Sequence, residues 1–198
     1  ASPPQLFDRA RLASKRDRAA ARFSDYAFLK DAVSSDLIER LDDTARIFER
    51  GLELGAAGGA LTAALLARGK VRDMIAADLS PMMTALAAAS GLQAETLDEE
   101  TLGQADASRD LIVSGLGLHW VNDLPGALIQ IRKALAPDGL FIGALFGAGT
   151  LSELRSVLIE AESDITGALS PRLSPLPALA DMAGLLQRAG FALPVADR

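Results

Sequence analysis

Short apolar runs alternate with amphipathic segments between residues 47 and 146, and this alternation predicts the core of the fold. The apolar runs are typical of buried strands, and the segments between them carry apolar residues three and four positions apart, as helices do. The expected strands are 51–54, 74–77, 94–97, 111–114 and 140–146, and the expected helices are 59–68, 81–89 and 124–135. Such an order predicts an α/β, Rossmann-like, doubly wound and mostly parallel sheet with helices on both faces. A turn is expected at 136–139, between the third of these helices and the last strand.

Two further helices are predicted before the first strand. The first, Leu6–Arg22, is strongly basic, and it either docks an acidic partner or presents a solvated face. Apolar residues recur every four positions in the second: Val33, Leu37, Leu41 and Ala45. We expect residues 1–46 to form a helical lid over the crevice of a second domain, 47–198. Tyr26, the only tyrosine, then either lines the pocket or packs with its hydroxyl at the surface.

The C-terminal part carries a long connection and an incomplete strand pair. Residues 150–177 are too many for a simple connector, so we expect a helix at 151–162 and a Ser/Pro stretch that borders the substrate pocket. After a helix at 179–189, residues 191–195 are expected to form a strand. No partner strand precedes Arg198, and a bare sheet edge is unfavourable. We therefore expect the natural chain to continue, or a second subunit to supply the strand.

A cluster of small residues follows the first strand and predicts a ligand-binding turn. Without bulky side chains the backbone can bend sharply, and the next helix points its free N–H groups at the same place. A dinucleotide-binding turn needs three glycines, of which only Gly55 is present. An S-adenosylmethionine-type turn matches at Glu53, Gly55 and Gly59 and has Ala57 in place of a glycine. A plain strand-to-helix turn is the remaining interpretation.

An acid at the end of the second strand supports a nucleotide-like ligand. Asp78 follows Gly55 by 23 residues, close to the spacing at which a carboxylate meets ribose hydroxyls in doubly wound folds. Asp78 is also suited to cap the helix that begins at Pro81, and the two roles are compatible.

Composition excludes several classes of function. The chain has 198 residues, no cysteine and one histidine, so thiolate chemistry and a multi-histidine metal site are ruled out, and no metal is expected. A net charge of −6 argues against broad nucleic-acid binding. No run has the length of a membrane span and no signal peptide is recognisable, which favours the cytoplasm, or the mitochondrial matrix if a presequence was removed.

The ordered set of segments resembles class I S-adenosylmethionine-dependent methyltransferases. The matching segments are Glu53–Gly55, Ala77–Asp78, Asp98, Asp110–Ser114 and Leu135–Leu140. The resemblance implies that Glu53 organises the turn, Asp78 binds ribose and Asp98 meets the adenine amine. It implies this cofactor-binding set, for S-adenosylmethionine and its product S-adenosylhomocysteine: Glu53, Gly55, Ala56, Ala57, Gly59, Asp78, Leu79, Asp98, Glu99 and Ser114.

A narrower resemblance covers nearly the whole chain. It is similar to the subgroup of the respiratory complex I assembly factor 5, related to the malonyl-carrier-protein methyltransferase of biotin synthesis. The segments that carry it are 6–9, 16–20, 116–125, 141–147, 150–155 and 170–175. The subgroup implies two reactions, methyl transfer to a small molecule or protein, or hydroxylation of an arginine on a respiratory subunit. A module that binds the cofactor without turnover is the third hypothesis.

The remaining site candidates concern the acceptor. His119 lies just past the fourth strand and is the only imidazole that can serve as a base; it is equally suited to be a neutral histidine at a helix start. Substrate-pocket candidates are Tyr26, His119, Trp120 and Arg172. The sequence names no acceptor, and it is compatible with a monomer or a dimer.

Overall fold

The computed structural model describes residues 5–167, 170 and 172–198. By its internal contacts the chain divides into two compact units, residues 1–145 and 146–198. The N-terminal helices and the whole sheet therefore belong to one unit, and the division of the chain into a lid and a second domain at residue 46 stays a prediction. Residues 168, 169 and 171 of the predicted Ser/Pro stretch lie outside the described residues.

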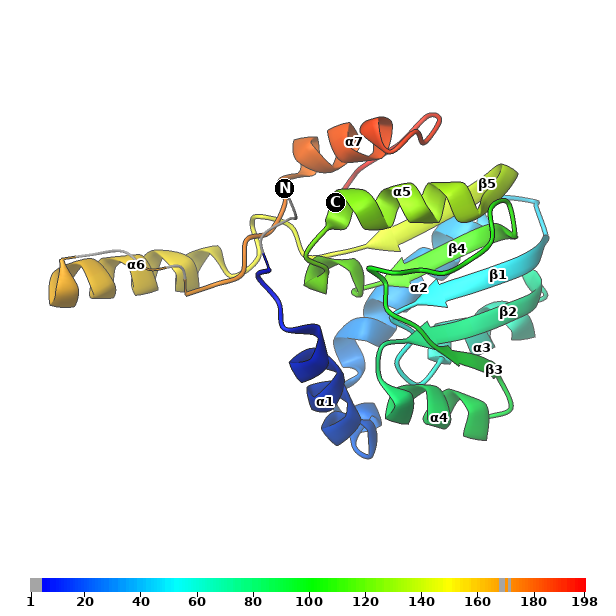
Figure 1. The fold of residues 1–198 in the computed structure, drawn as a ribbon, viewed down its shortest axis with the longest axis horizontal. Coiled ribbons are helices and arrows are strands. Elements are labelled where there is room, and N and C mark those ends of the chain that lie inside the picture. The colour runs from blue at the N-terminus through cyan, green and yellow to red at the C-terminus, as the bar shows by residue number, and fades with distance from the viewer. Residues whose placement is uncertain (1–4, 168–169, 171) are drawn as a thin grey trace. The chain divides into compact units, whose positions relative to one another are not determined.

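Five parallel strands form a single sheet in the first unit (Figure 1). They are β1 (Phe48–Leu54), β2 (Val71–Asp78), β3 (Gln93–Thr96), β4 (Arg109–Gly115) and β5 (Leu135–Ala144). Their order is β3-β2-β1-β4-β5, so the chain steps outward from β1 to β3 and then returns to the other side of β1. This reversal between β1 and β4 opens a crevice at the carboxyl ends of the strands. The predicted fold class and all five strands are confirmed.

Helices connect the strands, and capping residues fix where two of these helices begin. They are α3 (Ala60–Ala67), α4 (Pro81–Ala89) and α5 (Leu124–Ala134). Ser80 caps α4 by accepting from the Met83 amide, and Asp123 caps α5 by accepting from the Gly126 amide. Ser80, rather than Asp78, is thus the cap of α4. Before the sheet lie α1 (Arg9–Ala20), the short 3-10 helix η1 (Phe23–Tyr26) and α2 (Phe28–Asp42); Ala45 falls beyond the end of α2.

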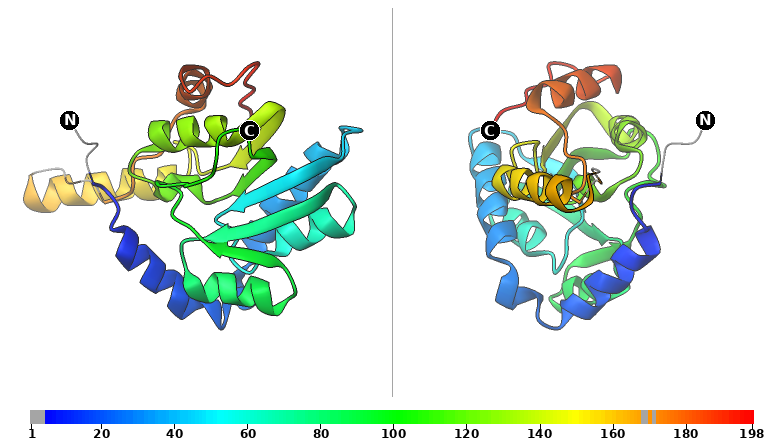
Figure 2. Two further views of the ribbon diagram at one scale, coloured as in Figure 1. Left: turned by 45° about the vertical axis from the view of Figure 1, so that its right-hand side comes forward. Right: turned by 90° about the vertical axis from the view of Figure 1, so that its left-hand side faces the viewer.

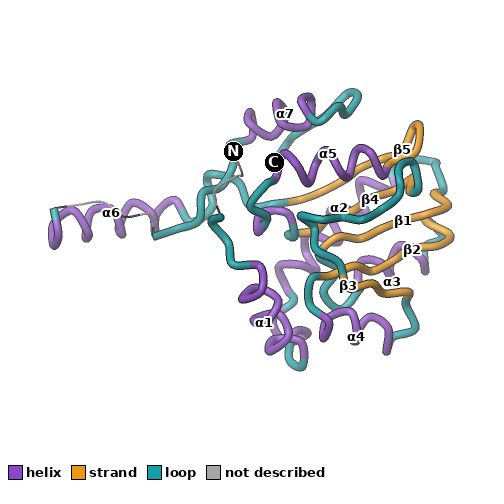
Figure 3. The backbone as a smooth tube through the Cα atoms, viewed as in Figure 1, coloured by secondary structure: helices purple, strands orange, loops and turns teal. Residues whose placement is uncertain are grey.

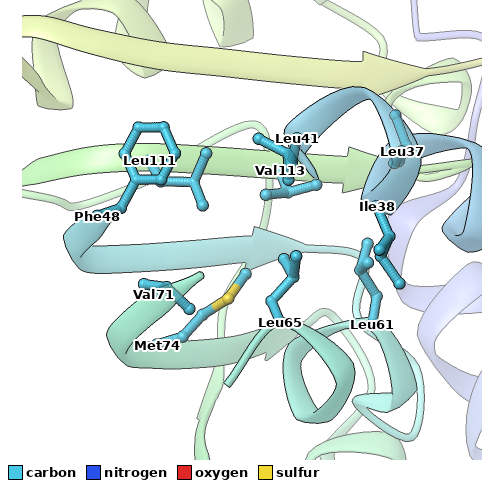
Figure 4. Packing of buried hydrophobic residues seen from close by; sticks show 10 residues of the cluster. All are labelled: Leu37, Ile38, Leu41, Phe48, Leu61, Leu65, Val71, Met74, Leu111 and Val113. Atoms are coloured by element: carbon cyan, nitrogen blue, oxygen red, sulfur yellow. The ribbon is translucent and has the colours of Figure 1, made fainter. Parts of the chain in front are cut away.

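The core lies between the sheet and the helices α2 and α3. Figure 4 shows ten buried side chains from these elements packed together: Leu37, Ile38, Leu41, Phe48, Leu61, Leu65, Val71, Met74, Leu111 and Val113. The right-hand view of Figure 2 shows α2 and α3 on one face of the sheet and α5 on the other. Because both faces are covered, residues 51–54 of β1 and 111–115 of β4 are buried without a break rather than at alternate positions.

Two local predictions need correction. The expected turn at 136–139 lies within β5, as an irregularity: Arg109 pairs with Leu135 but Leu111 pairs with Leu140, so three extra residues bulge from β5. Asp138 there has a left-handed backbone, with φ 59°. Residues 191–195 form no strand, because no neighbouring strand in the described chain pairs with them and Pro194 has no N–H to donate. β5 accordingly has no further strand beside it among the described residues.

The described residues of the second unit, 146–198, form two helices. They are α6 (Ser152–Thr166) and α7 (Leu179–Arg188), close to the expected bounds (Figure 3). Within the described parts of the chain, neither these nor the other helices are both long and apolar enough to cross a membrane.

Candidate functional site

Acidic side chains gather where β1, β2 and β3 end. Glu53 is the second-to-last residue of β1, Asp78 ends β2, and Asp98 and Glu99 follow β3. The side chains of Glu53 and Glu99 are fully buried and that of Asp78 is 2% exposed, whereas that of Asp98 is 29% exposed. The carboxyl ends of parallel strands share one edge of a sheet, so these carboxylates face one crevice.

Glu53 joins β1 to the start of α3. Its Oε2 accepts a hydrogen bond from the Thr62 amide at 3.1 Å and another from the Thr62 hydroxyl at 2.8 Å. The cap position of α3 is Gly59, which has no side chain to receive the free amides of the first turn. A carboxylate here replaces the missing cap and interacts favourably with the positive end of the helix dipole.

The small-residue turn between β1 and α3 has a left-handed backbone at three positions. These are Gly55 (φ 69°), Ala57 (φ 52°) and Gly59 (φ 78°). A Cβ at position 55 would lie 3.1 Å from the Cα of Gly117, so this glycine is required by space as well as by backbone angle. Ala57 adopts a conformation that disfavours a side chain, and its methyl group packs against Ala20 of α1.

Asp78 ties this turn to β2. Its Oδ2 accepts from the Ala57 amide at 2.9 Å, and its Oδ1 accepts from the Ser80 amide at 2.9 Å. A third donor, Nη1 of Arg16, lies 3.1 Å from Oδ1. The carboxylate expected to meet a ligand therefore also holds the backbone that would surround that ligand.

Three basic side chains from the N-terminal helices form ion pairs with these acids. Arg9 donates to Asp98 Oδ1 at 2.7 Å and makes a close contact with Glu99. Burial by itself lowers the pKa of Arg9, but the neighbouring Glu99 and Asp98 carboxylates outweigh burial and raise that pKa above its ordinary value. Arg16 lies between Asp78 and Glu99.

Lys30, near the start of α2, provides the third cation. Its Nζ donates to the carbonyl oxygens of Gly55 at 2.8 Å and Gly115 at 3.0 Å, and it lies 3.3 Å from Glu53 Oε1. These acceptors belong to the carboxyl ends of the neighbouring strands β1 and β4.

The sequence interpretation treated the basic helix as one face, and the structure divides it. Arg9 and Arg16 are seven positions apart, two helical turns, and both turn inward. Four exposed basic residues at intervals of four, three and four positions mark the opposite face: Arg11, Lys15, Arg18 and Arg22. Helical spacing was thus the signal that separates the two sets. No comparable signal marks Lys30.

A cavity of about 150 Å³ lies at this crevice. Its lining residues are Arg16, Phe23, Lys30, Gly55, Ala57, Asp78, Met83, Gly115, Leu116 and Trp120. Tyr26 does not contribute to this lining: it is 64% exposed and its hydroxyl receives a hydrogen bond from Arg22. The surface alternative for this tyrosine is the one observed, because the 3-10 helix η1 turns Phe23 inward in its place.

His119 lies beside the cavity wall rather than in it. It belongs to the 3-10 helix η2 (Leu118–Trp120), is 9% exposed, and its ring centre is 5.1 Å from that of Trp120. Burial, helped by the positive charge of Arg16, lowers the pKa of His119 to about 4. The imidazole is therefore neutral near pH 7, and it is a weak base there.

The other predicted residues take supporting positions. Ala56 is buried and its amide donates to the Ala77 carbonyl, while Leu79 is half-buried. Ser114 is buried and its hydroxyl donates to the Leu54 carbonyl at 3.1 Å. Arg172 belongs to the second unit, where it pairs with Glu162 at 2.5 Å and lowers the pKa of that carboxyl. Its expected place beside the substrate stays a prediction.

Among residues 5–167, 170 and 172–198, no three or more His, Asp or Glu side chains are grouped so that they could hold a metal ion. The acids at the strand ends are instead paired with arginine and lysine.

Comparison with known proteins places this geometry in a family. Residues 8–194 match the model of a methyltransferase domain. The chain is 42% identical, over 94% of its length and 55% of the relative's, to the human protein named "Arginine-hydroxylase NDUFAF5, mitochondrial". It is 35% identical, over 98% of its length and 65% of the relative's, to the malonyl-[acyl-carrier protein] O-methyltransferase of Xylella fastidiosa (strain M23). The chain thus spans between half and two thirds of the length of these relatives.

Solved structures share the fold at lower identity. A chain from the complex of the Haloferax volcanii Trm112 methyltransferase activator with a methyltransferase gives a TM-score of 0.68 at 21% identity, covering 88% of this chain and 75% of that one. The Haemonchus contortus phosphoethanolamine N-methyltransferase 2, in complex with S-adenosylhomocysteine, gives 0.64 at 18%, covering 80% and 36%. The sheet order, the glycine turn and these matches agree: the chain belongs to the methyltransferase domain family, with the Rossmann-like fold of class I S-adenosylmethionine-dependent methyltransferases.

Proposed function

We propose that this chain binds S-adenosylmethionine at the carboxyl ends of β1, β2 and β3 and transfers its methyl group to an acceptor. The observation that carries the proposal is the gathering of buried carboxylates around a turn that excludes side chains at Gly55. The residues fit such a cofactor, because Glu99 Oε1 is buried beside that turn and accepts no hydrogen bond from the described residues. A ligand with hydroxyl and amine donors would satisfy acceptors of this kind.

The residues of the chain bind and orient, and the bound cofactor would supply an electrophilic methyl group. Asp78, held by the Ala57 and Ser80 amides, is placed to accept from ribose hydroxyls, and Asp98 from the adenine amine. Glu53 keeps the turn and α3 in register through Thr62. Trp120 and Phe23 line the cavity and keep water from the reacting atoms. Positioning supplies much of the rate in such a transfer.

The state of His119 bears on the acceptor class. With its pKa lowered to about 4, this imidazole is poorly matched to remove a proton near pH 7. An acceptor that is already ionised, such as a carboxylate, needs no base. We therefore favour a carboxylate oxygen as the acceptor, the chemistry implied by the name of the Xylella relative.

Arginine hydroxylation is the second candidate, and the name of the human relative at 42% identity favours it. That reaction adds an oxygen atom and requires an oxidant. The cellular location follows the same alternatives, the cytoplasm for a bacterial-type enzyme or the mitochondrial matrix for one of the human type.

Calorimetry with S-adenosylhomocysteine tests cofactor binding, and Asp78→Ala should weaken it by roughly 1–3 kcal/mol because ribose hydroxyls lose their acceptor. Asp73→Ala, an exposed acid at the opposite end of the same strand, is the matched control. Wild-type affinity in a folded Asp78→Ala protein would overturn the ribose assignment.

Mass spectrometry of acceptors after incubation with S-adenosylmethionine identifies the reaction. The acceptors are malonyl-carrier protein and an arginine-containing peptide. Gain of one methyl group on the first supports the proposal, and gain of one oxygen on the second replaces it with hydroxylation. Cofactor binding without change in either acceptor would point to the non-catalytic module.

A further inference from the structure

The N-terminal helices place three positive charges on the acceptors that a cofactor would need. Arg16 Nη1 lies 3.1 Å from Asp78 Oδ1 and 3.6 Å from Glu99 Oε1. Lys30 Nζ lies within hydrogen-bond distance of two backbone carbonyls at the ends of β1 and β4. Figure 1 shows α1 beyond the arrowheads of the strands.

The acceptor capacity of Asp78 sets a limit. A carboxylate offers about four lone-pair positions, and Asp78 already accepts from the Ala57 amide, the Ser80 amide and Arg16. Its Oδ1 carries two of these donors. The two backbone donors belong to the connections that follow β1 and β2 and cannot leave. Arg16 is therefore the donor that must yield if both ribose hydroxyls are to bind this carboxylate.

The available space leads to the same conclusion. Small-molecule sites typically measure about 300–1,000 Å³, whereas the cavity holds about 150 Å³. Arg16 of α1, Phe23 of η1 and Lys30 of α2 form one side of it. The other lining residues lie at the strand ends, in the glycine turn, on α4 and in η2. Moving the N-terminal residues outward therefore enlarges the cavity without displacing the sheet.

α1 is seated on the sheet mainly by polar contacts. Ala20 is its only buried residue, packed with Ala57 and Met83. Asp17 Oδ1 accepts from the Ser80 hydroxyl at 2.5 Å and from the Met82 amide at 3.1 Å, which anchors the helix to the start of α4. A helix with so little apolar burial is held weakly enough to be displaced by a ligand with matching polar groups.

We propose that α1 and the start of α2 form a self-docked plug, defined by Arg9, Arg16, Asp17 and Lys30, which competes with the cofactor for the acids at the strand ends. The inference rests on the proposed function, since it concerns the same site. Arg9, Arg16 and Lys30 neutralise Asp98, Asp78 and Glu53 in the closed state, and the hydroxyl and amine donors of a bound cofactor replace them. The apparent affinity is then the intrinsic affinity reduced by the fraction of open molecules.

Calorimetry with S-adenosylhomocysteine on plug variants tests the competition. Arg16→Met should tighten binding by about three- to tenfold, because closed molecules become rarer. Asp17→Ala should also tighten binding, although Asp17 touches none of the acids. This variant separates the effect of releasing α1 from the effect of removing a positive charge beside Asp78. Arg18→Met, on the exposed face of α1, is the matched control and should leave the affinity unchanged.

Hydrogen exchange gives a second readout. Amides of residues 9–20 should exchange faster when wild-type protein is saturated with S-adenosylhomocysteine. Weaker binding by Arg16→Met, unchanged binding by Asp17→Ala, or slower exchange in α1 would each overturn the inference alone, and the first would make Arg16 a cofactor ligand. Absence of binding in the wild type and in every plug variant would overturn the proposed function, and the plug with it.

Discussion

Asp78→Asn isolates the contribution of one carboxylate to the cofactor turn. Asp78 is 2% exposed, and each of its oxygens accepts a backbone N–H, from Ala57 on one side and Ser80 on the other. Asparagine has the same shape but only one acceptor oxygen. Whichever way the amide is turned, its NH₂ group faces one of the two N–H groups, so one buried donor loses its partner.

The magnitude follows from these contacts. Leaving one buried N–H unsatisfied costs about 1–3 kcal/mol. Arg16, whose side chain is 16% exposed, also loses the charged partner that lies 3.1 Å away, which adds about 1 kcal/mol. We expect Asp78→Asn to lower the free energy of unfolding by about 2–4 kcal/mol in total.

Urea denaturation followed by circular dichroism measures this loss. Asp73→Asn is the matched control: it lies on the same strand, is exposed, and accepts from Gln93 Nε2 at 2.8 Å, a bond that asparagine can also make. The control should change the free energy of unfolding by less than about 0.5 kcal/mol. A loss of that small size for Asp78→Asn itself, at an unchanged denaturant slope, would refute the account of the turn.

Three further predictions concern the turn, the histidine and the second unit. Gly55→Ala should lower the free energy of unfolding by about 2–3 kcal/mol, because the residue has a left-handed backbone and its new Cβ would lie 3.1 Å from the Cα of Gly117. Gly69→Ala is the control: Gly69 has φ 65° but nothing within 4 Å of a Cβ, so its loss should be about 1 kcal/mol. Equal losses of the two variants in urea denaturation would contradict the close approach at Gly55. Burial lowers the pKa of His119 from 6.5 to about 4, so the free energy of unfolding should fall by on the order of 1–3 kcal/mol as the pH drops through that interval. His119→Asn should flatten this dependence of stability on pH. If urea denaturation at several pH values gives the same dependence for His119→Asn, another group titrates. Arg172→Ala should lower turnover more than affinity for S-adenosylhomocysteine, and parallel losses in assay and calorimetry would remove this arginine from the substrate site.

The sequence by itself determined the elements whose information is local. The helix at Pro81–Ala89 has the predicted bounds because Ser80, Pro81 and the apolar spacing all lie within it or next to it. The strands and the turn at Gly55 were predicted from the same kind of short-range signal. The carboxylates at the strand ends followed in turn, because parallel strands necessarily bring their carboxyl ends to one edge.

The second part of the site depended on residues far apart in the chain. Arg16 and Asp78 are 62 positions apart, and Lys30 meets Gly115 across 85. The sequence around a lysine in an amphipathic helix does not indicate whether its ammonium group will bind two buried carbonyl oxygens or water. Only the packing of α2 against β4 and β5 makes that choice.

The strand expected at residues 191–195 shows a local prediction that the tertiary structure overruled. Its local pattern favours an extended strand, but a strand is stable only when its N–H and C=O groups pair with a neighbour. No described segment provides one, and Leu193 is 94% exposed. Local propensity therefore sufficed for the helices, whose hydrogen bonds are internal. The tertiary structure decided the sheet edge and the pairing of the N-terminal cations with the acids, because each of these contacts needs a partner that only the folded chain supplies.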